Sequence, residues 1–206
     1  TALPSNELAR AGLAQLYKYG VKVHNHPSEQ TRTGIYYYES GQGARAGRII
    51  YDRAYSAFSY LQPGQINWEK VFETSDWFHW SGITPALNEN LVAVCKEALV
   101  AAKNKGLTIS ADFNYRGTLW NYGKSCRDIM PELLQYCDII LADVDTAKLY
   151  FGISPDEKDL VNSTFGLLHK HLPNASHIVM TMRVQESASS NQYIGYLWHK
   201  GAIHQS

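Results

Sequence analysis

The chain has 206 residues, which suits one domain or one domain with an excursion, and a chain of this length buries roughly 70% of its unfolded surface. Nineteen basic and nineteen acidic side chains cancel to a net charge of zero. This balance excludes a general attraction to nucleic acid or to anionic membranes, so any bound anion must be held by a few placed cations.

The first predicted element is a capped helix that follows Ser5 and ends at Gly20. Apolar residues recur in it with helical spacing, so one face is expected to turn inward. That face carries Ala9, Leu13, Leu16 and Tyr17.

Two β-rich runs come next, "GIYYYES" at 34–40 and "GRIIYDR" at 47–53, and the glycine-rich segment 41–46 joins them. This pattern predicts a hairpin with a longer loop, because aromatic and β-branched residues favour strands. The mixture of aromatic and charged residues does not suit strands buried on both faces. We therefore predict a small β excursion at 31–55 within a single domain formed by residues 1–206.

A strand–helix–strand unit is predicted from Asp76 onward. "DWFHWSG" suggests a short strand, "NENLVAVCKEALVAAKNKG" an amphipathic helix that ends at Gly106, and "LTISADFN" a second strand. Units of this kind close right-handed, with parallel strands. The inward positions of the helix are expected to be Leu91, Val94, Cys95, Ala98, Leu99 and Ala102.

The same alternation continues through the rest of the chain. The patterns predict helices at 125–136, 146–152 and 156–171, strands at 138–143 and 177–182, and a hairpin that turns at Lys200-Gly201. Strands that alternate with helices indicate an α/β fold, and we expect a doubly wound, mostly parallel sheet.

Ligands of open α/β sheets bind beyond the carboxyl ends of the strands. The predicted strands end at Ser81-Gly82, at Asn114-Tyr115-Arg116 and at Asp143. Arg116 is thereby placed where an anion would lie, and its planar guanidinium matches the oxygens of a carboxylate or a phosphate. The competing interpretation is an arginine that pairs with a helix carbonyl or with Asp112.

A second group of candidate residues lies on the predicted hairpin. Tyr51 and Arg53 are two positions apart on one strand and so share a face, and Tyr36 belongs to the neighbouring strand. Phenols and a guanidinium on one sheet face suit a polyhydroxylated acid, since the hydroxyls can bond to hydroxyls and the guanidinium to a carboxylate. The alternative is an ordinary exposed sheet face, where tyrosine and arginine are common.

Other motifs are weak or missing from the sequence. Cys95, Cys126 and Cys137 have no metal or redox spacing, which predicts the reduced thiols of a cytoplasmic protein. The histidine pairs at 24–26 and 169–171 have no acidic or cysteine neighbours and are expected at the surface. No apolar run reaches the length of about 18 residues that predicts a membrane span.

The motifs at the predicted strand ends resemble those of a known family. "DWFHWSGITPAL", "DFNYRGTLW" and "AKLYFGI", preceded by "GIYYYE" and "IIYDRAYSAF", are similar to segments of the ribokinase-like (phosphofructokinase-B type) carbohydrate kinases. Within that family they resemble the subgroup that acts on 2-keto-3-deoxygluconate. The likeness runs from about Leu8 to Ile153 and weakly beyond. "SGITPAL" and "NYR-x-x-LW" are its specific parts.

The resemblance implies a reaction and a role for each candidate residue. It implies transfer of phosphate from ATP, with Mg²⁺, to a hydroxyl of a keto-deoxy sugar acid. Tyr36, Tyr51 and Arg53 would contact the sugar acid from a lid formed by 31–55, a segment that in this family often contributes to a homo-oligomer interface. Arg116 would lie between sugar acid and phosphates.

The cofactor side of the resemblance involves the same strand end. Asn114 and Tyr115 would stand beside Arg116 at the nucleotide phosphates, and Asp143 would hold a metal-bound water. At the family's Asn-x-x-Glu, however, this chain has Asp143-Val144-Asp145-Thr146, so Thr146 brings no charge.

The chain also departs from the family at both ends. It contains neither the family's N-terminal strand with a glycine pair nor the "GAGD" segment that supplies an anion hole and the aspartate acting as base. We therefore expect a middle fragment of a longer enzyme. The alternatives are a related kinase for a neutral sugar such as fructose or ribose, and a sugar-acid-binding protein without catalysis.

Overall fold

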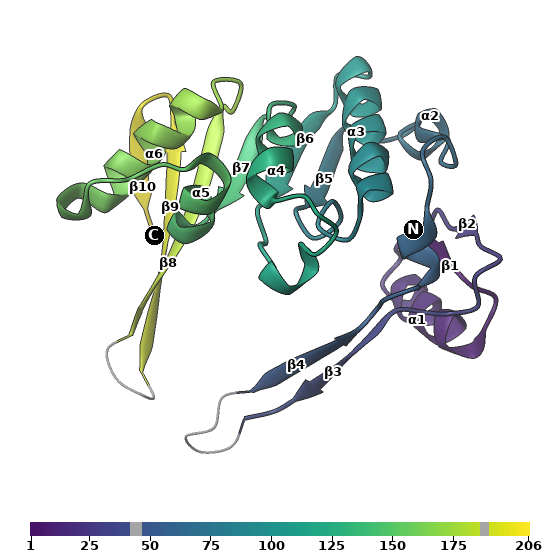
Figure 1. Ribbon diagram of the computed structural model, residues 1–206. Helices are drawn as coiled ribbons and strands as arrows, with labels where there is room; N and C mark the ends of the chain where they lie inside the picture. The colour runs from purple at the N-terminus through teal and green to yellow at the C-terminus, as the bar shows by residue number, and fades with distance from the viewer. Residues whose placement is uncertain (42–46, 186–189) are drawn as a thin grey trace. The chain divides into compact units, whose positions relative to one another are not determined.

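The computed structural model describes residues 1–41, 47–185 and 190–206, which form two compact units (Figure 1). The first unit is Thr1–Asn67 and the second is Trp68–Ser206. Residues 42–46 of the predicted 31–55 excursion lie outside the described residues. Each unit is built around its own strands and helices.

Among its described residues the first unit contains the α-helix α1 (Glu7–Lys18). It begins one residue later than predicted, because Asn6 rather than Ser5 is its N-cap and accepts a hydrogen bond of 2.9 Å from the Ala9 N–H. The predicted inward face is wrong for Leu16 and Tyr17, which are exposed. Ala9 is the only buried residue of the helix.

The small size of this unit explains the exposed helix face. Its other elements are the two-residue strands β1 (Ala2–Leu3) and β2 (His26–Pro27), a short 3₁₀ helix η1 (Ala57–Tyr60) and a hairpin. Such short elements offer little apolar surface, so helical periodicity alone did not ensure burial.

The predicted hairpin is confirmed. Strand β3 (Ile35–Glu39) pairs antiparallel with β4 (Arg48–Asp52), and Tyr36 lies opposite Tyr51. Side chains alternate between its two faces, so the residues that flank Tyr36 and Tyr51 on each strand point the other way.

The second unit is organised around a six-stranded sheet in the order β10-β9-β8-β7-β6-β5. Strands β5 to β8 are parallel, and β9 and β10 extend the sheet antiparallel, which confirms the mostly parallel α/β class. The strands are β5 (Trp77–Ser81), β6 (Thr108–Asp112), β7 (Ile139–Ala142), β8 (His177–Gln185), β9 (Asn191–His199) and β10 (Ala202–Gln205). The turn between the last two is at Lys200-Gly201, as predicted.

The helices of this unit connect successive parallel strands. After the short α2 (Trp68–Val71) come α3 (Glu89–Asn104), α4 (Cys126–Leu134), α5 (Val144–Phe151) and α6 (Leu160–His171). From α3 to α6 each helix contacts the next (Figure 1). Right-handed crossovers that advance in one direction along a sheet place their helices on one face, which accounts for this row. Among the described residues no helix is long and apolar enough to cross a membrane.

Helix α3 agrees closely with the pattern of its sequence. Its buried residues are the six predicted inward positions. Asn88 caps its start by accepting a hydrogen bond of 3.0 Å from the Leu91 N–H, and Gly106 follows its end with a φ of +74°. Packing of this face against the sheet contributes to one continuous core.

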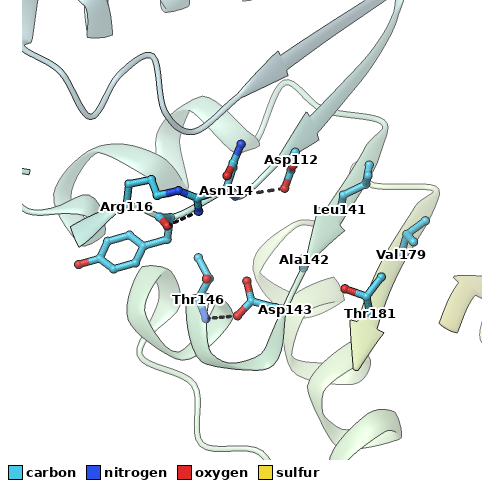
Figure 2. A pocket seen from close by; sticks show the side chains of 10 residues that line it. Asp112, Asn114, Arg116, Leu141, Ala142, Asp143, Thr146, Val179 and Thr181 are labelled. Atoms are coloured by element: carbon cyan, nitrogen blue, oxygen red, sulfur yellow. Dashed lines mark hydrogen bonds between the residues drawn. The ribbon is translucent and has the colours of Figure 1, made fainter. Parts of the chain in front are cut away.

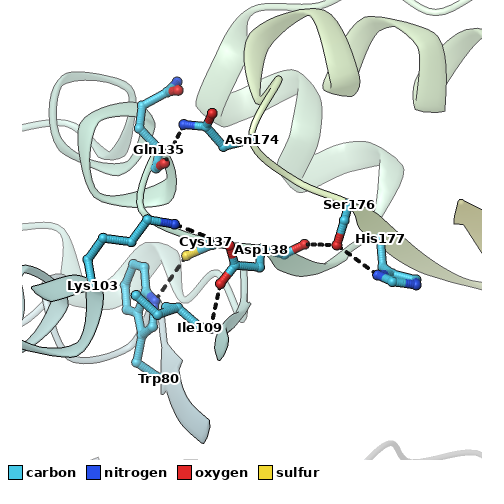
Figure 3. Close-up of polar contacts among 9 residues, drawn as sticks. All are labelled: Trp80, Lys103, Ile109, Gln135, Cys137, Asp138, Asn174, Ser176 and His177. Carbon is cyan, nitrogen blue, oxygen red and sulfur yellow. Dashed lines mark hydrogen bonds and ion pairs between the residues drawn. The ribbon is translucent and has the colours of Figure 1, made fainter. Parts of the chain in front are cut away.

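Asp138 fixes the amino ends of three parallel strands (Figure 3). Its carboxylate accepts a hydrogen bond of 2.8 Å from the Ile109 N–H and pairs with Lys103 at 3.2 Å. Its main-chain carbonyl accepts hydrogen bonds from the Ser176 N–H at 2.8 Å and from the His177 N–H at 3.2 Å. With this register set, β6, β7 and β8 end at a common edge of the sheet.

Candidate functional site

A cavity of about 390 Å³ opens at the carboxyl ends of β6, β7 and β8 (Figure 2). It lies wholly within the second unit. Its polar lining includes Asp112, Asn114, Arg116, Asp143, Thr146 and Thr181. The position agrees with the rule that ligands of open α/β sheets bind beyond the strand ends.

The loop after β6 leaves the sheet through an uncommon backbone conformation. Asn114 has a φ of +40°, a left-handed value that asparagine tolerates better than most residues. Its N–H donates to the Asp112 carboxylate at 3.1 Å, and its side-chain amide donates to the Ser81 hydroxyl at 3.0 Å. These contacts turn the chain so that Tyr115 and Arg116 line the cavity.

The guanidinium of Arg116 has no acidic partner in the described part of the chain. It is exposed, and it donates a hydrogen bond of 2.8 Å to the main-chain carbonyl of the adjacent Tyr115. The ion pair with Asp112, which the sequence left as an alternative, is therefore not formed. A guanidinium that is not neutralised and faces a cavity retains its donors for an anionic ligand.

Asp143 has a defined structural task at the cavity wall. Its carboxylate caps α5 by accepting a hydrogen bond of 2.8 Å from the Thr146 N–H. Within residues 1–41, 47–185 and 190–206, no group of three or more His, Cys, Asp or Glu side chains could hold a metal ion. The cavity therefore does not build a metal site from its own side chains alone.

Two residues next to the loop were assigned no individual role from the sequence, although one of them, Gly82, lies at a predicted strand end. The Tyr150 phenol, which is fully buried, donates a hydrogen bond of 2.8 Å to the carbonyl of Phe113, the residue before Asn114. Burial raises the pKa of this phenol, which favours its protonated, hydrogen-bond-donating form. Gly82 packs against the same carbonyl. Only the neighbouring strand and helix in the fold bring these groups to the loop.

The residues predicted on the hairpin lie together in the first unit. The rings of Tyr36 and Tyr51 are 6.5 Å apart between centroids. The guanidinium carbon of Arg53 lies 4.3 Å from the centroid of the Tyr51 ring, which is a cation–π distance. The structure thus brings Tyr36, Tyr51 and Arg53 onto one face of the hairpin.

These features define the class of the protein. A mostly parallel α/β sheet with a guanidinium in a cavity at its strand ends is typical of proteins that bind anionic ligands there. Residues 1–197 match the pfkB family carbohydrate kinases, and the chain belongs to this family. Its fold is accordingly the ribokinase-like α/β fold predicted from the sequence.

Similar proteins extend this comparison. The chain is 31% identical over 164 residues to a 2-dehydro-3-deoxygalactonokinase of Haloferax volcanii, a match that covers 80% of this chain and 51% of that relative. The crystal structure of a 2-dehydro-3-deoxygluconokinase from Thermotoga maritima is similar with a TM-score of 0.90 and 31% identity. A PfkB family carbohydrate kinase from Listeria grayi has a TM-score of 0.88 and 27% identity.

The chain is shorter than these relatives. Each of the two solved structures is matched over 100% of this chain and 62% of its own. The chain therefore spans about half the length of the curated relative and less than two thirds of the solved ones.

Proposed function

We propose that the protein containing this chain is a cytoplasmic kinase that transfers phosphate from ATP to a keto-deoxy sugar acid of the 2-keto-3-deoxygluconate type. The observation that carries this proposal is the guanidinium of Arg116 in the strand-end cavity, which has no acidic partner among the described residues. Family membership and the sugar acids named for the relatives from Haloferax volcanii and Thermotoga maritima support it.

In this proposal the cavity of the second unit binds the phosphates. Phosphoryl transfer depends mainly on positioning and on stabilising negative charge in the transition state. Arg116 supplies the positive charge, and its planar donors suit the oxygens of the group being transferred. Asn114 and Tyr115 line the cavity beside it and contribute an amide and a phenol to the phosphate contacts.

Mg²⁺ would accompany ATP, because this ion is usually held by one or two carboxylates together with substrate phosphates and water. Asp143 is the cavity carboxylate that follows β7, and it fits an indirect, water-mediated role while it caps α5. When bound, the ion neutralises phosphate charge. Thr146 provides no second carboxylate, so the charge that Arg116 supplies becomes more important.

The hairpin of the first unit binds the sugar acid in this proposal. The Arg53 guanidinium can pair with the carboxylate of the substrate. The Tyr36 and Tyr51 phenols on the same face can exchange hydrogen bonds with sugar hydroxyls. A neutral sugar would offer Arg53 no carboxylate, which makes a fructose- or ribose-type substrate the less favoured alternative.

A substrate panel tests this function. The natural protein is supplied with ATP and Mg²⁺, and ADP production is followed with 2-keto-3-deoxygluconate, 2-keto-3-deoxygalactonate, fructose and ribose. We expect the highest kcat/KM with one of the two acids. Preference for a neutral sugar would replace the proposed substrate, and a protein that binds the acids without releasing ADP would be a sensor rather than a kinase.

We also propose that the hairpin contributes to a homo-oligomer. Tyr37 and Ile50 lie opposite each other on the face that does not carry Tyr36 and Tyr51, and both are about half exposed. Exposed aromatic and aliphatic side chains on a two-stranded ribbon favour contact with a second copy. Light scattering should give more than one subunit for the natural protein and fewer for a Tyr37→Ser, Ile50→Ser variant.

A further inference from the structure

Two side chains from different elements form hydrogen bonds at the start of the Asn114–Arg116 loop. Ser81, the last residue of β5, accepts the hydrogen bond of the Asn114 side-chain amide at 3.0 Å. Tyr150, in the last turn of α5, donates to the Phe113 carbonyl at 2.8 Å. The two bonds therefore fix the Phe113 carbonyl and the Asn114 side chain, on either side of the peptide bond that joins these residues.

The position of these bonds matters because the backbone changes direction there. Asn114 has a left-handed φ, a conformation that persists only where its surroundings favour it. Rotation of the preceding peptide would redirect every residue that follows, including Arg116. The Tyr150 hydroxyl is enclosed in the core, so water cannot replace it easily when it is removed.

We propose that Ser81 and Tyr150 are positioning residues for phosphoryl transfer, which act through the Asn114–Arg116 loop rather than by touching a ligand. The inference rests on the proposed function, because it assigns them the orientation of the loop that binds the phosphates. The Tyr150 hydrogen bond fixes the plane of the peptide between Phe113 and Asn114. The Ser81 hydrogen bond fixes the orientation of the Asn114 side-chain amide. The orientation of Arg116 toward the cavity is then already fixed before the substrate binds.

Three variants of the natural protein test the roles. Tyr150→Phe and Ser81→Ala each remove one hydroxyl and leave the rest of the side chain in place, and Ser81→Thr restores a hydroxyl at position 81. Tyr122→Phe is the matched control. Its phenol also donates to a main-chain carbonyl, that of Pro85 at 2.7 Å, but it does not line the cavity.

Each variant is measured for kcat, for the KM of the sugar acid, for thermal stability and for binding of inorganic tripolyphosphate by calorimetry. We expect Tyr150→Phe and Ser81→Ala to lower kcat and tripolyphosphate affinity about tenfold each, with the sugar-acid KM within about twofold of wild type. Ser81→Thr should recover most of the loss. Tyr122→Phe should lower Tm as Tyr150→Phe does, without the loss of kcat.

The outcomes separate this inference from the proposed function. Wild-type kcat and tripolyphosphate affinity in both Tyr150→Phe and Ser81→Ala would overturn the positioning roles, as would an equal loss in Tyr122→Phe. If the wild-type protein phosphorylates no sugar acid, the proposed function fails, and the tripolyphosphate affinities of the same variants still decide the positioning roles. A wild-type protein that neither phosphorylates a sugar acid nor binds tripolyphosphate would overturn both.

Discussion

Gly82 lies so close to the loop of the site that a Cβ atom added to it would stand 2.2 Å from the carbonyl oxygen of Phe113. The same oxygen accepts the hydrogen bond of the Tyr150 phenol. The Gly82 N–H, in turn, donates a hydrogen bond of 2.9 Å to the Asp112 carbonyl. Absence of a side chain at 82 is therefore what allows the chain after β5 to pass directly beside the end of β6.

Gly82→Ala should destabilise the protein, because the added methyl group meets main chain rather than a flexible side chain. We expect a loss of about 3 kcal/mol in the free energy of unfolding, the upper part of the range for overpacking, measured by urea denaturation. Gly166→Ala is the control. Gly166 lies inside α6, and a Cβ atom added there would meet no neighbouring atom within 4 Å, so alanine should add about 0.5–1 kcal/mol. Equal stability of the two variants would contradict the close approach.

Replacing the two guanidiniums should separate turnover from sugar binding. Arg116→Ala is expected to lower kcat by about 10²–10³, because a charge that stabilises the transition state is lost. Arg53→Ala is expected to raise the sugar-acid KM by about tenfold or more, as loss of a charge-assisted hydrogen bond does. Steady-state kinetics on the natural protein measure both. Arg10→Ala, on the exposed surface of α1, is the control and should change neither. Unchanged parameters in both test variants would remove these assignments.

Asp138→Ala should weaken the second unit through the hydrogen bond to Ile109. Ile109 is fully buried, and its N–H would lose the carboxylate at 2.8 Å and find no water. We expect a loss of about 1–3 kcal/mol in the free energy of unfolding. Lys103→Ala removes only a partly exposed ion pair with the same carboxylate and should cost less than about 1 kcal/mol. A larger effect from Lys103→Ala would show that the ion pair, not the hydrogen bond, dominates.

The three cysteines are unpaired and buried, as predicted, and they should make the fold sensitive to alkali. Burial raises the pKa of Cys95 and of Cys137 from 9.0 to about 12. The folded state favours the protonated thiols. Their contribution to the free energy of unfolding is therefore fully present below about pH 9 and is lost as the pH rises toward about 12. Urea denaturation should show stability falling over this range. Cys95→Ala should fall less steeply, and a curve as steep as that of the wild type would contradict this role.

The fold was largely predictable because its main signals are local. The inward face of α3 and the turn at Lys200-Gly201 follow from side-chain spacing and turn chemistry, and both were confirmed. The prediction failed at α1, where Leu16 and Tyr17 have the correct spacing but are exposed among the described residues. Periodicity indicates which face of a helix is apolar. That face becomes buried only where another element offers enough apolar surface to pack against it.

The site was predictable in part. The order of strands and helices places Asn114, Tyr115, Arg116 and Asp143 at strand ends, and the structure gathers them at one cavity. Thr181 and Tyr150 carried no such signal, since neither residue type nor spacing distinguishes them from core or strand residues. Their positions depend on which strands are neighbours and on the register between them.

By itself the sequence determined the alternation of strands and helices, and with it the edge of the sheet where a guanidinium would lie. Only the tertiary structure decided that Arg116 has no carboxylate partner in the described part of the chain, and that Gly82, Ser81 and Tyr150 support the loop before it. The physical reason is the separation along the chain over which each interaction acts. Backbone preferences act over a few neighbouring residues, but a hydrogen bond between residues 33 or 37 positions apart exists only after the sheet and its helices have packed.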